Sequence, residues 1–285
     1  MGKILITGAT GHLGTTIIEY LLKNTTADKI VALARNKEKA TLLAERGIET
    51  RIGNFDDKQS LENALQGIDK VLLISGTELH RLQQHKNVVD ASKKAGVNYI
   101  VYTGAALKSD FSNPFMNDHF KTEDYIRENG FTFTFLRNSF YSDALPVLAG
   151  EAATETGIFL PAGTGKVPFV LRRDLAEATA NVLLQNGHEN KTYELTGRNQ
   201  YSFGDIANIL SELSGKNVAY TNADESTFSE TLRQHGLTEM MIEIRASFSR
   251  DIRNRQFEII SNDLQNLLGR TPADLKIVLK DIYNL

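Results

Sequence analysis

The sequence K-I-L-I-T-G-A-T-G-H-L-G, residues 3–14, decides the fold of this chain. Residues 3–7 form a short β-rich apolar run, and Gly8, Gly11 and Gly14 follow before a helical pattern begins near Leu13. A strand that turns through glycines into a helix leaves backbone N–H groups and a positive helix end at one point, where a pyrophosphate fits. The spacing is G-x-x-G-x-x-G rather than the common G-x-G-x-x-G. The strand before it and the helix after it therefore favour nucleotide binding over an ordinary turn.

The composition is that of an ordinary globular protein and excludes several classes. The 285 residues are 41% hydrophobic and 24% charged, which is ample for a sizeable core. The net charge of −3 gives no bulk attraction to nucleic acid or an anionic membrane, and no run approaches a ~20-residue membrane span. The absence of cysteine excludes disulfides, thiolate metal sites and a catalytic thiol. With no export signal, we expect a cytoplasmic location.

Short β-rich runs alternate with helical patterns from residue 3 to residue 137. Such alternation predicts a doubly wound parallel sheet of the Rossmann type, with helices on both faces and ligands at the carboxyl ends of the strands. The expected strands are 3–7, 29–34, 49–53, 70–75, 98–103 and 131–137. The expected helices cover 12–24, 36–46, 57–66, 79–95 and 117–129.

The alternation fades after residue 137, which indicates a second, smaller and mostly helical part. We expect residues 1–150 to form the nucleotide-binding domain and residues 151–285 a substrate-binding region, partly interwoven with the first. The sequence predicts a hairpin over 157–170, helices over 172–185 and 202–214, strands over 191–195 and 217–222, and mostly helix thereafter. For the amphipathic helix around Met240, a packed helix, a lid and a homodimer contact all stay open.

The residues after the second strand indicate which dinucleotide is bound. An acidic side chain at this position would bind the ribose 2′-hydroxyl of NAD, but Arg35 stands there, with Lys37 and Lys39 close behind. A guanidinium matches a 2′-phosphate in fork geometry, and a nearby ammonium adds positive charge. We therefore expect NADP(H) rather than NAD(H). The alternative for the lysines is the solvated start of a helix.

Two further strand ends offer candidate contacts. Asn54 and Phe55 follow the third strand and can bracket the adenine, one by hydrogen bonds and the other by its ring. The alternative is a helix N-cap at Asp56 or Asp57 beside a core phenylalanine. Gly76 follows the fourth strand and permits close approach of the backbone to a cofactor.

A set of motifs is spread over nearly the whole chain. They are I-T-G-A-T-G-H-L-G (6–14), A-R-N-K-E-K-A (34–40), G-N-F-D-D (53–57), V-Y-T-G (101–104), L-R-N-S-F-Y (136–141), A-G-T-G-K (162–166), R-R-D-L-A (172–176) and K-T-Y-E-L-T-G (191–197). Together they resemble the motifs of the NmrA-like atypical short-chain dehydrogenase/reductases. Within that family they are most similar to the bacterial NADPH:quinone oxidoreductases and triphenylmethane dye reductases.

The resemblance implies an NADP(H)-binding Rossmann domain followed by a small substrate domain. It assigns the 2′-phosphate to Arg35, with Lys39 as a helper. It implies a pyrophosphate loop made of Gly8, Thr10, Gly11, His12, Leu13 and Gly14. It also implies that the ribose and nicotinamide lie along Ser75, Gly76, Thr103 and Asn138.

The resemblance also bears on catalysis, because standard short-chain dehydrogenases use a Tyr-x-x-x-Lys pair on the helix after the fifth strand. The corresponding positions here hold His119 and Glu123, which are four apart and share a helix face. The usual acid is absent, which disfavours alcohol–ketone interconversion. Quinone reduction depends less on that pair, because water or a hydroxyl can protonate the hydroquinone anion and the protein mainly orients two flat rings.

Two side chains are candidate catalytic proton donors. We expect His119 to titrate near neutral pH, with a helix-surface or ribose-contacting histidine as the alternative. Tyr141 is the second candidate, with a core or lid aromatic as the alternative. The loop over residues 111–117 is expected to line one wall of an apolar slot for a small planar substrate, and Phe140 and Tyr141 the other.

We therefore expect an NADPH-dependent oxidoreductase that transfers hydride to a quinone or a similar planar electrophile, such as a dye or an enone. The competing hypothesis is a non-catalytic NADP(H)-sensing regulatory protein of the NmrA-like kind. No metal, nucleic acid or membrane partner is expected. His80 and His85 lie on a polar helix start, and His188 and His235 in loops, so we interpret these four histidines as incidental.

Overall fold

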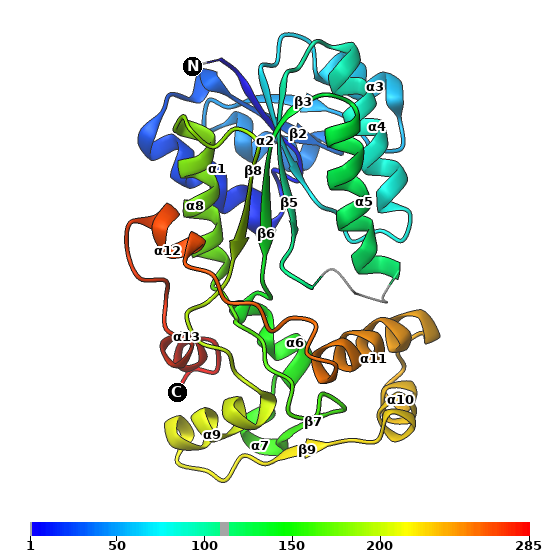
Figure 1. Cartoon of the computed structure of the whole chain (residues 1–285), viewed down its shortest axis with the longest axis vertical. Helices are drawn as coiled ribbons and strands as arrows, with labels where there is room; N and C mark the ends of the chain where they lie inside the picture. The colour runs from blue at the N-terminus through cyan, green and yellow to red at the C-terminus, as the bar shows by residue number, and fades with distance from the viewer. Residues whose placement is uncertain (1, 109–113) are drawn as a thin grey trace. The chain divides into compact units, whose positions relative to one another are not determined.

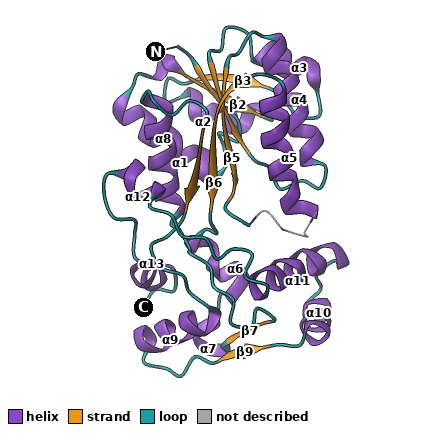
Figure 2. Ribbon diagram, viewed as in Figure 1, coloured by secondary structure: helices purple, strands orange, loops and turns teal. Residues whose placement is uncertain are grey.

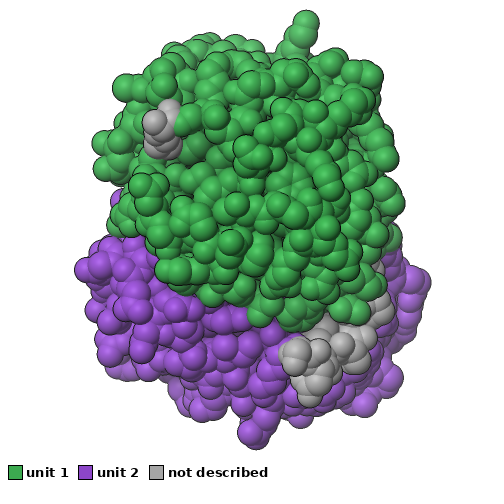
Figure 3. All heavy atoms as spheres, turned by 45° about the horizontal axis from the view of Figure 1, so that its top comes forward, with its two compact units in different colours: residues 1–105, 114–138, 175–193 green, residues 106–113, 139–174, 194–285 purple. Residues whose placement is uncertain are grey.

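The computed structural model describes residues 2–108 and 114–285 (Figure 1). The chain forms two compact units, each assembled from separate segments. Unit 1 comprises Met1–Ala105, Pro114–Asn138 and Leu175–Tyr193, and unit 2 comprises Ala106–Asn113, Ser139–Asp174 and Glu194–Leu285 (Figure 3). The assignment of cofactor binding to residues 1–150 and of substrate binding to residues 151–285 stays a prediction.

A seven-stranded sheet in the order β3-β2-β1-β4-β5-β6-β8 forms the centre of unit 1 (Figure 2). Every pairing from β3 to β6 is parallel. The strands are β1 (Ile4–Ile6), β2 (Ile30–Ala34), β3 (Glu49–Ile52), β4 (Lys70–Ile74), β5 (Tyr99–Ala105), β6 (Thr132–Asn138) and β8 (Lys191–Leu195). The predicted doubly wound α/β fold is confirmed, with strand ends that differ from the prediction by a residue or two.

The strand order reverses beside β1. This strand pairs with β2 on one side, where Ile4 lies opposite Ile30, and with β4 on the other, where Ile6 lies opposite Leu72. Both neighbours are apolar and almost wholly buried, as the interior of a parallel sheet requires. At such a switch point the crossover connections leave in opposite directions, and a ligand crevice opens outside the carboxyl ends of the strands. The topology therefore predicts a ligand site at the carboxyl ends of β1 and β4.

Helices cover both faces of the sheet. The helices α3 (Lys58–Ala64), α4 (Arg81–Lys94) and α5 (Pro114–Glu128) pack side by side over one face (Figure 1). The helices α1 (His12–Asn24) and α8 (Arg172–Leu184) lie over the other (Figure 1). A 3₁₀ turn, η1 (Ala27–Lys29), precedes β2, and α2 (Lys37–Ala44) packs against β2 and β3. The helices α3, α4 and α5 bury an apolar core against the sheet. It includes Val71, Leu73, Val88, Ile100 and Ile126.

The turn from β1 into α1 depends on close backbone contacts. Gly8 has a φ of +58°, a left-handed conformation that glycine adopts without a Cβ penalty. The Gly11 N–H donates to the Gly8 carbonyl at 2.9 Å, and Gly11 is the N-cap of α1. A Cβ on Gly14 would lie 2.2 Å from the same carbonyl oxygen. The helix can therefore begin directly on the turn only because residue 14 has no side chain.

Unit 2 is mostly helical, as the sequence predicts. Its remaining elements are η2 (Ser142–Ala144), α6 (Leu145–Ala149), α7 (Ala153–Thr156), β7 (Ile158–Leu160), α9 (Phe203–Ser214), β9 (Tyr220–Asn222), α10 (Glu225–Gln234), α11 (Glu239–Arg253), α12 (Asp263–Leu268) and α13 (Leu275–Ile282). Over the part of the chain that the structure describes, none of the helices has the length and apolar character of a membrane span.

The predicted hairpin over residues 157–170 is wrong. The strand β7 pairs in parallel with β9, with Ile158 opposite Tyr220, instead of with the residues that follow its turn. The turn itself is bound to β9, because the Gly163 N–H donates to Asn222 Oδ1 at 2.8 Å and the Tyr220 hydroxyl donates to the Gly163 carbonyl at 3.1 Å. Glycines in this segment bend the chain, as the sequence predicts. The hydrogen bonds to β9 determine which strand β7 lies beside.

We predict that Gly14→Ala destabilises the fold by about 2 kcal/mol or more, because the new methyl group overlaps the backbone of Gly8 and Ala9 in the turn that follows β1. Gly11→Ala is the matched control. Its Cβ would lie 3.3 Å from the Gly8 oxygen and its φ of −86° suits alanine, so we expect a loss within about 1 kcal/mol. Urea unfolding followed by circular dichroism measures both. Equal unfolding midpoints for the two variants would show that the close approach does not constrain the turn.

Candidate functional site

The start of α1 presents backbone N–H groups that no side chain of the described residues caps. The exposed residues of the predicted pyrophosphate loop are Gly8, Thr10, Gly11 and His12. Leu13 and Gly14 are buried, so they can offer a ligand only their backbone. The first helical turn holds no acidic side chain to compete with an anion. An uncapped helix N-terminus of this kind suits an anionic pyrophosphate.

Hydroxyl side chains connect neighbouring strand ends at the same edge of the sheet. Thr7 Oγ1 accepts from the Ile74 N–H at 2.9 Å, and Thr103 Oγ1 accepts from the Ser75 N–H at 3.0 Å. Both threonines are buried. The structure thus brings the predicted residues Ser75, Gly76 and Thr103 together at the ends of β4 and β5.

Arg35 follows β2 directly, and its side chain is 76% exposed. The backbone beyond it is fixed by Asn36, whose side chain caps α2 by accepting from the Lys39 N–H at 3.0 Å. The Lys39 side chain is also exposed. The Arg35 guanidinium lies 3.9 Å from the carboxylate of Glu78, measured from Nη1 to Oε1. This exposed guanidinium is accessible to an anion that arrives from solvent.

The segment after β3 caps α3 and packs a phenylalanine against the core, which is the alternative to adenine binding. Asp57 caps α3 by accepting from two backbone N–H groups of the first turn. Phe55 is half-buried against the core of unit 1, and the exposed Asn54 accepts the Asp56 N–H through its side chain. The N-cap interpretation is confirmed for Asp57. The adenine contacts of Asn54 and Phe55 stay predictions.

His119 and Glu123 both lie on the buried side of α5, as their spacing predicts. Glu123 is 1% exposed, and its two oxygens bind the guanidinium of Arg137, Oε1 at 2.8 Å from Nε and Oε2 at 2.7 Å from Nη2. Arg127 adds a third donor at 3.4 Å. The ion pair anchors α5 to β6, which ends at the buried Asn138. Glu123 is therefore committed to Arg137 and is not available in the way that the lysine of a standard dehydrogenase is.

A buried polar cluster joins α4, β5 and α5 behind His119. The phenol oxygen of Tyr102 on β5 lies 2.8 Å from His119 Nδ1. On α4, His85 Nδ1 lies 2.9 Å from the Thr122 hydroxyl, and the His85 ring meets Tyr102 edge-on with centroids 5.5 Å apart. Thr122 donates its own hydrogen to the Asp118 carbonyl at 2.7 Å. His85 Nδ1 is therefore the donor toward Thr122.

Burial keeps this cluster uncharged. It lowers the pKa of His119 well below its ordinary value, and the positive charge of Arg81 adds to the effect. It lowers the pKa of His85 to about 3, again with Arg81 as the second cause. It raises the pKa of the Tyr102 phenol. The expectation that His119 titrates near neutral pH is therefore wrong, because burial keeps its ring neutral there.

The expectation that His85 lies on a polar helix start is also wrong, whereas its being incidental to function stays a prediction. The residue is fully buried, and its Nε2 has no hydrogen-bond partner among the described residues. A signal for this was present in the sequence. His85, Val88, Val89 and Ser92 recur at helical spacing and form the buried face of α4. Tyr102 carried no comparable signal, because its partners come from helices on either side of it in the chain.

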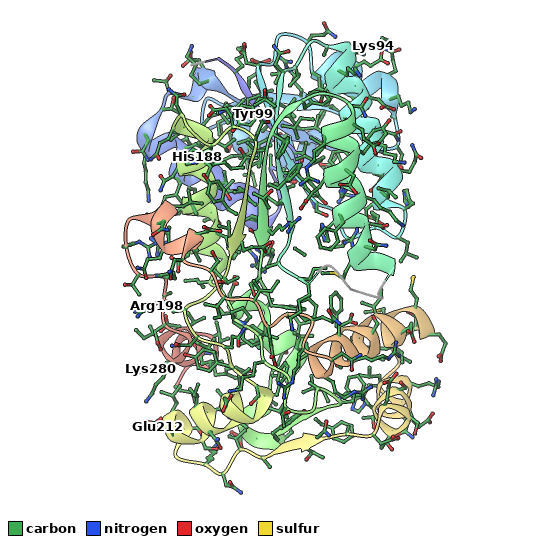
Figure 4. The ribbon with its side chains drawn as sticks, in the orientation of Figure 1. Lys94, Tyr99, His188, Arg198, Glu212 and Lys280 are labelled. Carbon is green, nitrogen blue, oxygen red and sulfur yellow. The ribbon has the colours of Figure 1, made fainter. Side chains whose placement is uncertain are left out.

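A second polar cluster lies at the opposite, amino end of the strands. The Tyr99 hydroxyl lies 2.5 Å from Thr134 Oγ1, and Thr134 donates to the His188 carbonyl at 2.7 Å. Tyr99 and His188 are labelled in Figure 4. His188 Nδ1 lies 2.8 Å from the Tyr193 hydroxyl, and burial lowers the pKa of His188. Because open parallel sheets bind ligands at their carboxyl ends, this cluster serves to hold the connection between α8 and β8.

Tyr141 belongs to unit 2, where the Arg172 guanidinium lies 4.8 Å from the centre of its ring. Arg172 also binds Asp143, with Nη1 2.8 Å from Oδ2. Tyr141 is thus half-buried, and its ring makes a cation–π contact with Arg172. Beside it, Phe140 packs edge-on against Phe257 with centroids 4.7 Å apart. The role of Tyr141 as a proton donor stays a prediction.

The predicted substrate slot over residues 111–117 lies largely outside the described residues. Phe111 is not described, and neither are the side chains of Pro114 and Phe115. Met116 is buried in unit 1. Across residues 2–108 and 114–285, no three histidine, aspartate or glutamate side chains gather in a way that suits a metal ion. The expected absence of a metal stays a prediction.

The fold and this edge of the sheet together define a class of protein. A doubly wound sheet with an uncapped glycine turn after β1 and an arginine after β2 is typical of dinucleotide-binding α/β proteins. Residues 1–262 match the model of the NmrA-like family. The chain belongs to that family.

Relatives with stated activities match the chain nearly from end to end. Quinone oxidoreductase 2 of Escherichia coli is 37% identical over 284 residues, which cover 99% of each chain. The solved structure of Citrobacter sp. triphenylmethane reductase complexed with NADP(H) has a TM-score of 0.93 and 39% identity, and the match covers 98% of this chain and 99% of that one. The structure of the Escherichia coli NADPH-dependent quinone oxidoreductase complexed with NADPH has a TM-score of 0.93 and 37% identity, with coverage of 99% and 100%. The predicted resemblance is confirmed.

We predict that the protein loses stability as the pH falls below about 6.5, the ordinary pKa of histidine. There the unfolded chain takes up a proton on each histidine, whereas folded His85 stays neutral down to about pH 3. Between about pH 6.5 and pH 3, His85 therefore removes about 1.4 kcal/mol of unfolding free energy for each unit by which the pH falls. His85→Asn should be less stable overall, yet its stability should depend on pH less steeply, by about one proton.

Urea unfolding at a series of pH values measures this dependence. His235→Asn, which removes an exposed histidine, is the matched control. A His85→Asn variant whose stability falls with pH as steeply as that of the unmodified protein would contradict the role assigned to burial.

Proposed function

We propose that the protein is an NADPH-dependent reductase that transfers hydride to a quinone or a similar planar electrophile, such as a triphenylmethane dye. One observation carries the proposal. The chain is 37–39% identical, over 98–99% of its length, to an NADPH-dependent quinone oxidoreductase and to a triphenylmethane reductase. Both relatives are matched over almost their whole length as well, so the likeness extends over residues 151–285, which we expect to bind the substrate, and is not confined to the glycine turn.

The residues present fit a dinucleotide. Gly14 lacks a side chain because the turn itself has no room for one, but the chain leaves nearly enough room for a Cβ on Gly11. A glycine at position 11 therefore keeps open the space in front of the helix N-terminus, where a pyrophosphate would bind. Arg35 offers a guanidinium in solvent at the end of β2, where a 2′-phosphate would bind.

We assign the contacts to NADPH as follows. The pyrophosphate is bound by the backbone of Gly8, Thr10, Gly11, His12, Leu13 and Gly14. The 2′-phosphate is bound by Arg35 with Lys39, and the adenine by Asn54 and Phe55. The ribose and nicotinamide are bound along Ser75, Gly76, Thr103 and Asn138. When bound, NADPH supplies the hydride, and the chain orients the two reacting rings.

His119 is one candidate source of the proton that completes reduction. Its Nδ1 is engaged by the phenol of Tyr102. Because burial raises the pKa of this phenol, Tyr102 keeps its hydrogen and can donate it to Nδ1, which leaves the hydrogen of His119 on Nε2. As Nε2 gives up this hydrogen to the reduced acceptor, Nδ1 takes the hydrogen of Tyr102 in the same step, and solvent then reprotonates the phenolate. Tyr141, held under Arg172, is the second candidate donor. We also propose a cytoplasmic location. A homodimer stays a prediction that light scattering of the purified protein tests.

Incubation of the purified protein with NADPH and a panel of quinones and triphenylmethane dyes tests the function. We expect NADPH to be consumed in the presence of an acceptor and not in its absence. Tight binding of NADPH without consumption by any acceptor would replace this proposal with an NADP(H)-sensing role.

We predict that Arg35→Ala raises the KM for NADPH about 10- to 100-fold and changes the KM for NADH little, because only NADPH carries the phosphate that this guanidinium binds. Arg46→Ala removes another exposed arginine beyond the far end of α2 and is the matched control. Equal KM values for NADPH and NADH in the unmodified protein would remove the basis for the assignment.

We predict that His119→Gln or Tyr141→Phe lowers kcat with a quinone about 100-fold, the lower end of what a positioned proton donor contributes. Tyr99→Phe is the control, because it removes a tyrosine hydroxyl from the amino end of the same sheet. Steady-state kinetics at neutral pH measure all three. If His119→Gln and Tyr141→Phe both keep the full kcat, solvent supplies the proton and neither residue is catalytic.

A further inference from the structure

The guanidinium that we assign to the 2′-phosphate already has a partner in the protein. Arg35 Nη1 lies 3.9 Å from Glu78 Oε1, and the two side chains are 76% and 54% exposed. No other carboxylate of the described residues pairs with Arg35. An anion that binds this guanidinium from solvent therefore meets the Glu78 carboxylate at close range.

The backbone around Glu78 is held in place. Its carbonyl accepts the Arg81 N–H at 3.1 Å where α4 begins. Two residues further on, His80 Nε2 lies 3.0 Å from the Asp56 carboxylate, which Gln84 also binds at 2.9 Å. The segment is thus connected both to α4 and to the loop after β3. Glu78 is kept beside the end of β2 by these contacts and not by its weak pairing with Arg35 alone.

We propose that Glu78 is a specificity-determining residue that competes with the 2′-phosphate of NADPH for Arg35 and so narrows the preference for NADPH over NADH. The proposal rests on the proposed use of NADPH. Two effects act in the same direction. The carboxylate occupies the guanidinium before the phosphate arrives, and it repels the phosphate, which carries nearly two negative charges at neutral pH.

The same carboxylate does not hinder NADH. A ribose 2′-hydroxyl is a hydrogen-bond donor, and an acidic side chain at this edge of a Rossmann fold is the usual acceptor for it. Glutamine offers a carbonyl oxygen in the same place, so Glu78→Gln keeps an acceptor for the hydroxyl and removes only the charge. The substitution is therefore expected to change the affinity for NADPH and not the affinity for NADH.

The size of the effect follows from exposure. Two unit charges about 4 Å apart in water interact enough to change an equilibrium constant about fivefold, and salt screens such exposed charges. We expect Glu78→Gln to tighten NADPH binding about three- to tenfold at low ionic strength and to leave NADH binding unchanged. At about 1 M salt the difference between the variant and the unmodified protein should largely disappear.

Isothermal titration calorimetry of the full-length protein measures this effect without turnover. The ligands are NADPH and NADH, together with adenosine 2′,5′-bisphosphate and adenosine 5′-phosphate, which differ only in the 2′-phosphate. Glu45→Gln is the matched control, because it removes one negative charge from the exposed C-terminal end of α2. We expect Glu78→Gln, and not Glu45→Gln, to tighten the two ligands that carry a 2′-phosphate.

The outcomes separate this inference from the proposed function. If the unmodified protein binds NADPH more tightly than NADH, and Glu78→Gln binds NADPH no better than Glu45→Gln does, the role of Glu78 is wrong and the proposed function stands. If NADPH has no advantage over NADH and Arg35→Ala does not weaken its binding, the assignment of Arg35 is wrong and both proposals fall. A gain for Glu78→Gln that is equal with all four ligands, or one that persists in high salt, also overturns the role of Glu78, because it is then not an effect of charge on the 2′-phosphate.

Discussion

The constraint on which unit 1 depends is the contact between two backbone segments at the start of the chain. The Gly8 carbonyl oxygen occupies the space where a Cβ of residue 14 would lie, so only the short segment 7–11 separates the end of β1 from the start of α1. This short connection fixes where the helix N-terminus stands relative to β1, the strand at which the sheet order reverses. It leaves the first N–H groups of α1 uncapped at the edge of the sheet, near the end of β4. A side chain at position 14 would separate helix and strand, and the proposed anion site would lose its geometry.

The helix α5 carries a buried histidine and a buried glutamate at the two positions that the resemblance aligns with the Tyr–Lys pair of standard short-chain dehydrogenases. The histidine is sealed against Tyr102 and kept neutral, and the glutamate is paired with Arg137. An ion pair this deep stabilises only while both partners are present, because either charge alone would be buried without compensation. His119 is therefore not a charged acid at neutral pH. This agrees with an acceptor such as a quinone, whose reduced form needs little help to gain a proton.

The sequence was sufficient to predict the sheet and its glycine turn, because both depend on patterns that are local or regularly repeated. The strands up to residue 137 are short apolar runs between helical patterns, and His119 and Glu123 share a face simply because they are four apart. The polar cluster is different. Tyr102 reads as one more residue of a buried strand, and its contacts with His85 and His119 depend on how α4 and α5 cross that strand. The pairing of β7 with β9 was missed for the same reason. Turn residues around Gly163 predict a bend, but the partner strand lies about 60 residues further along the chain.

Neither compact unit is a continuous piece of the chain, and this affects how the protein is made. The strand β6 ends at Asn138, but its neighbour β8 begins at Lys191, after a whole segment of unit 2. At about 5 to 20 residues per second, a ribosome needs about 3 to 10 s to make the residues in between. During that interval β6 is the open edge of a nearly complete sheet, and an open edge is a template for pairing with other chains. The nascent chain is thus more prone to misassembly than the finished protein, in which β8 covers that edge.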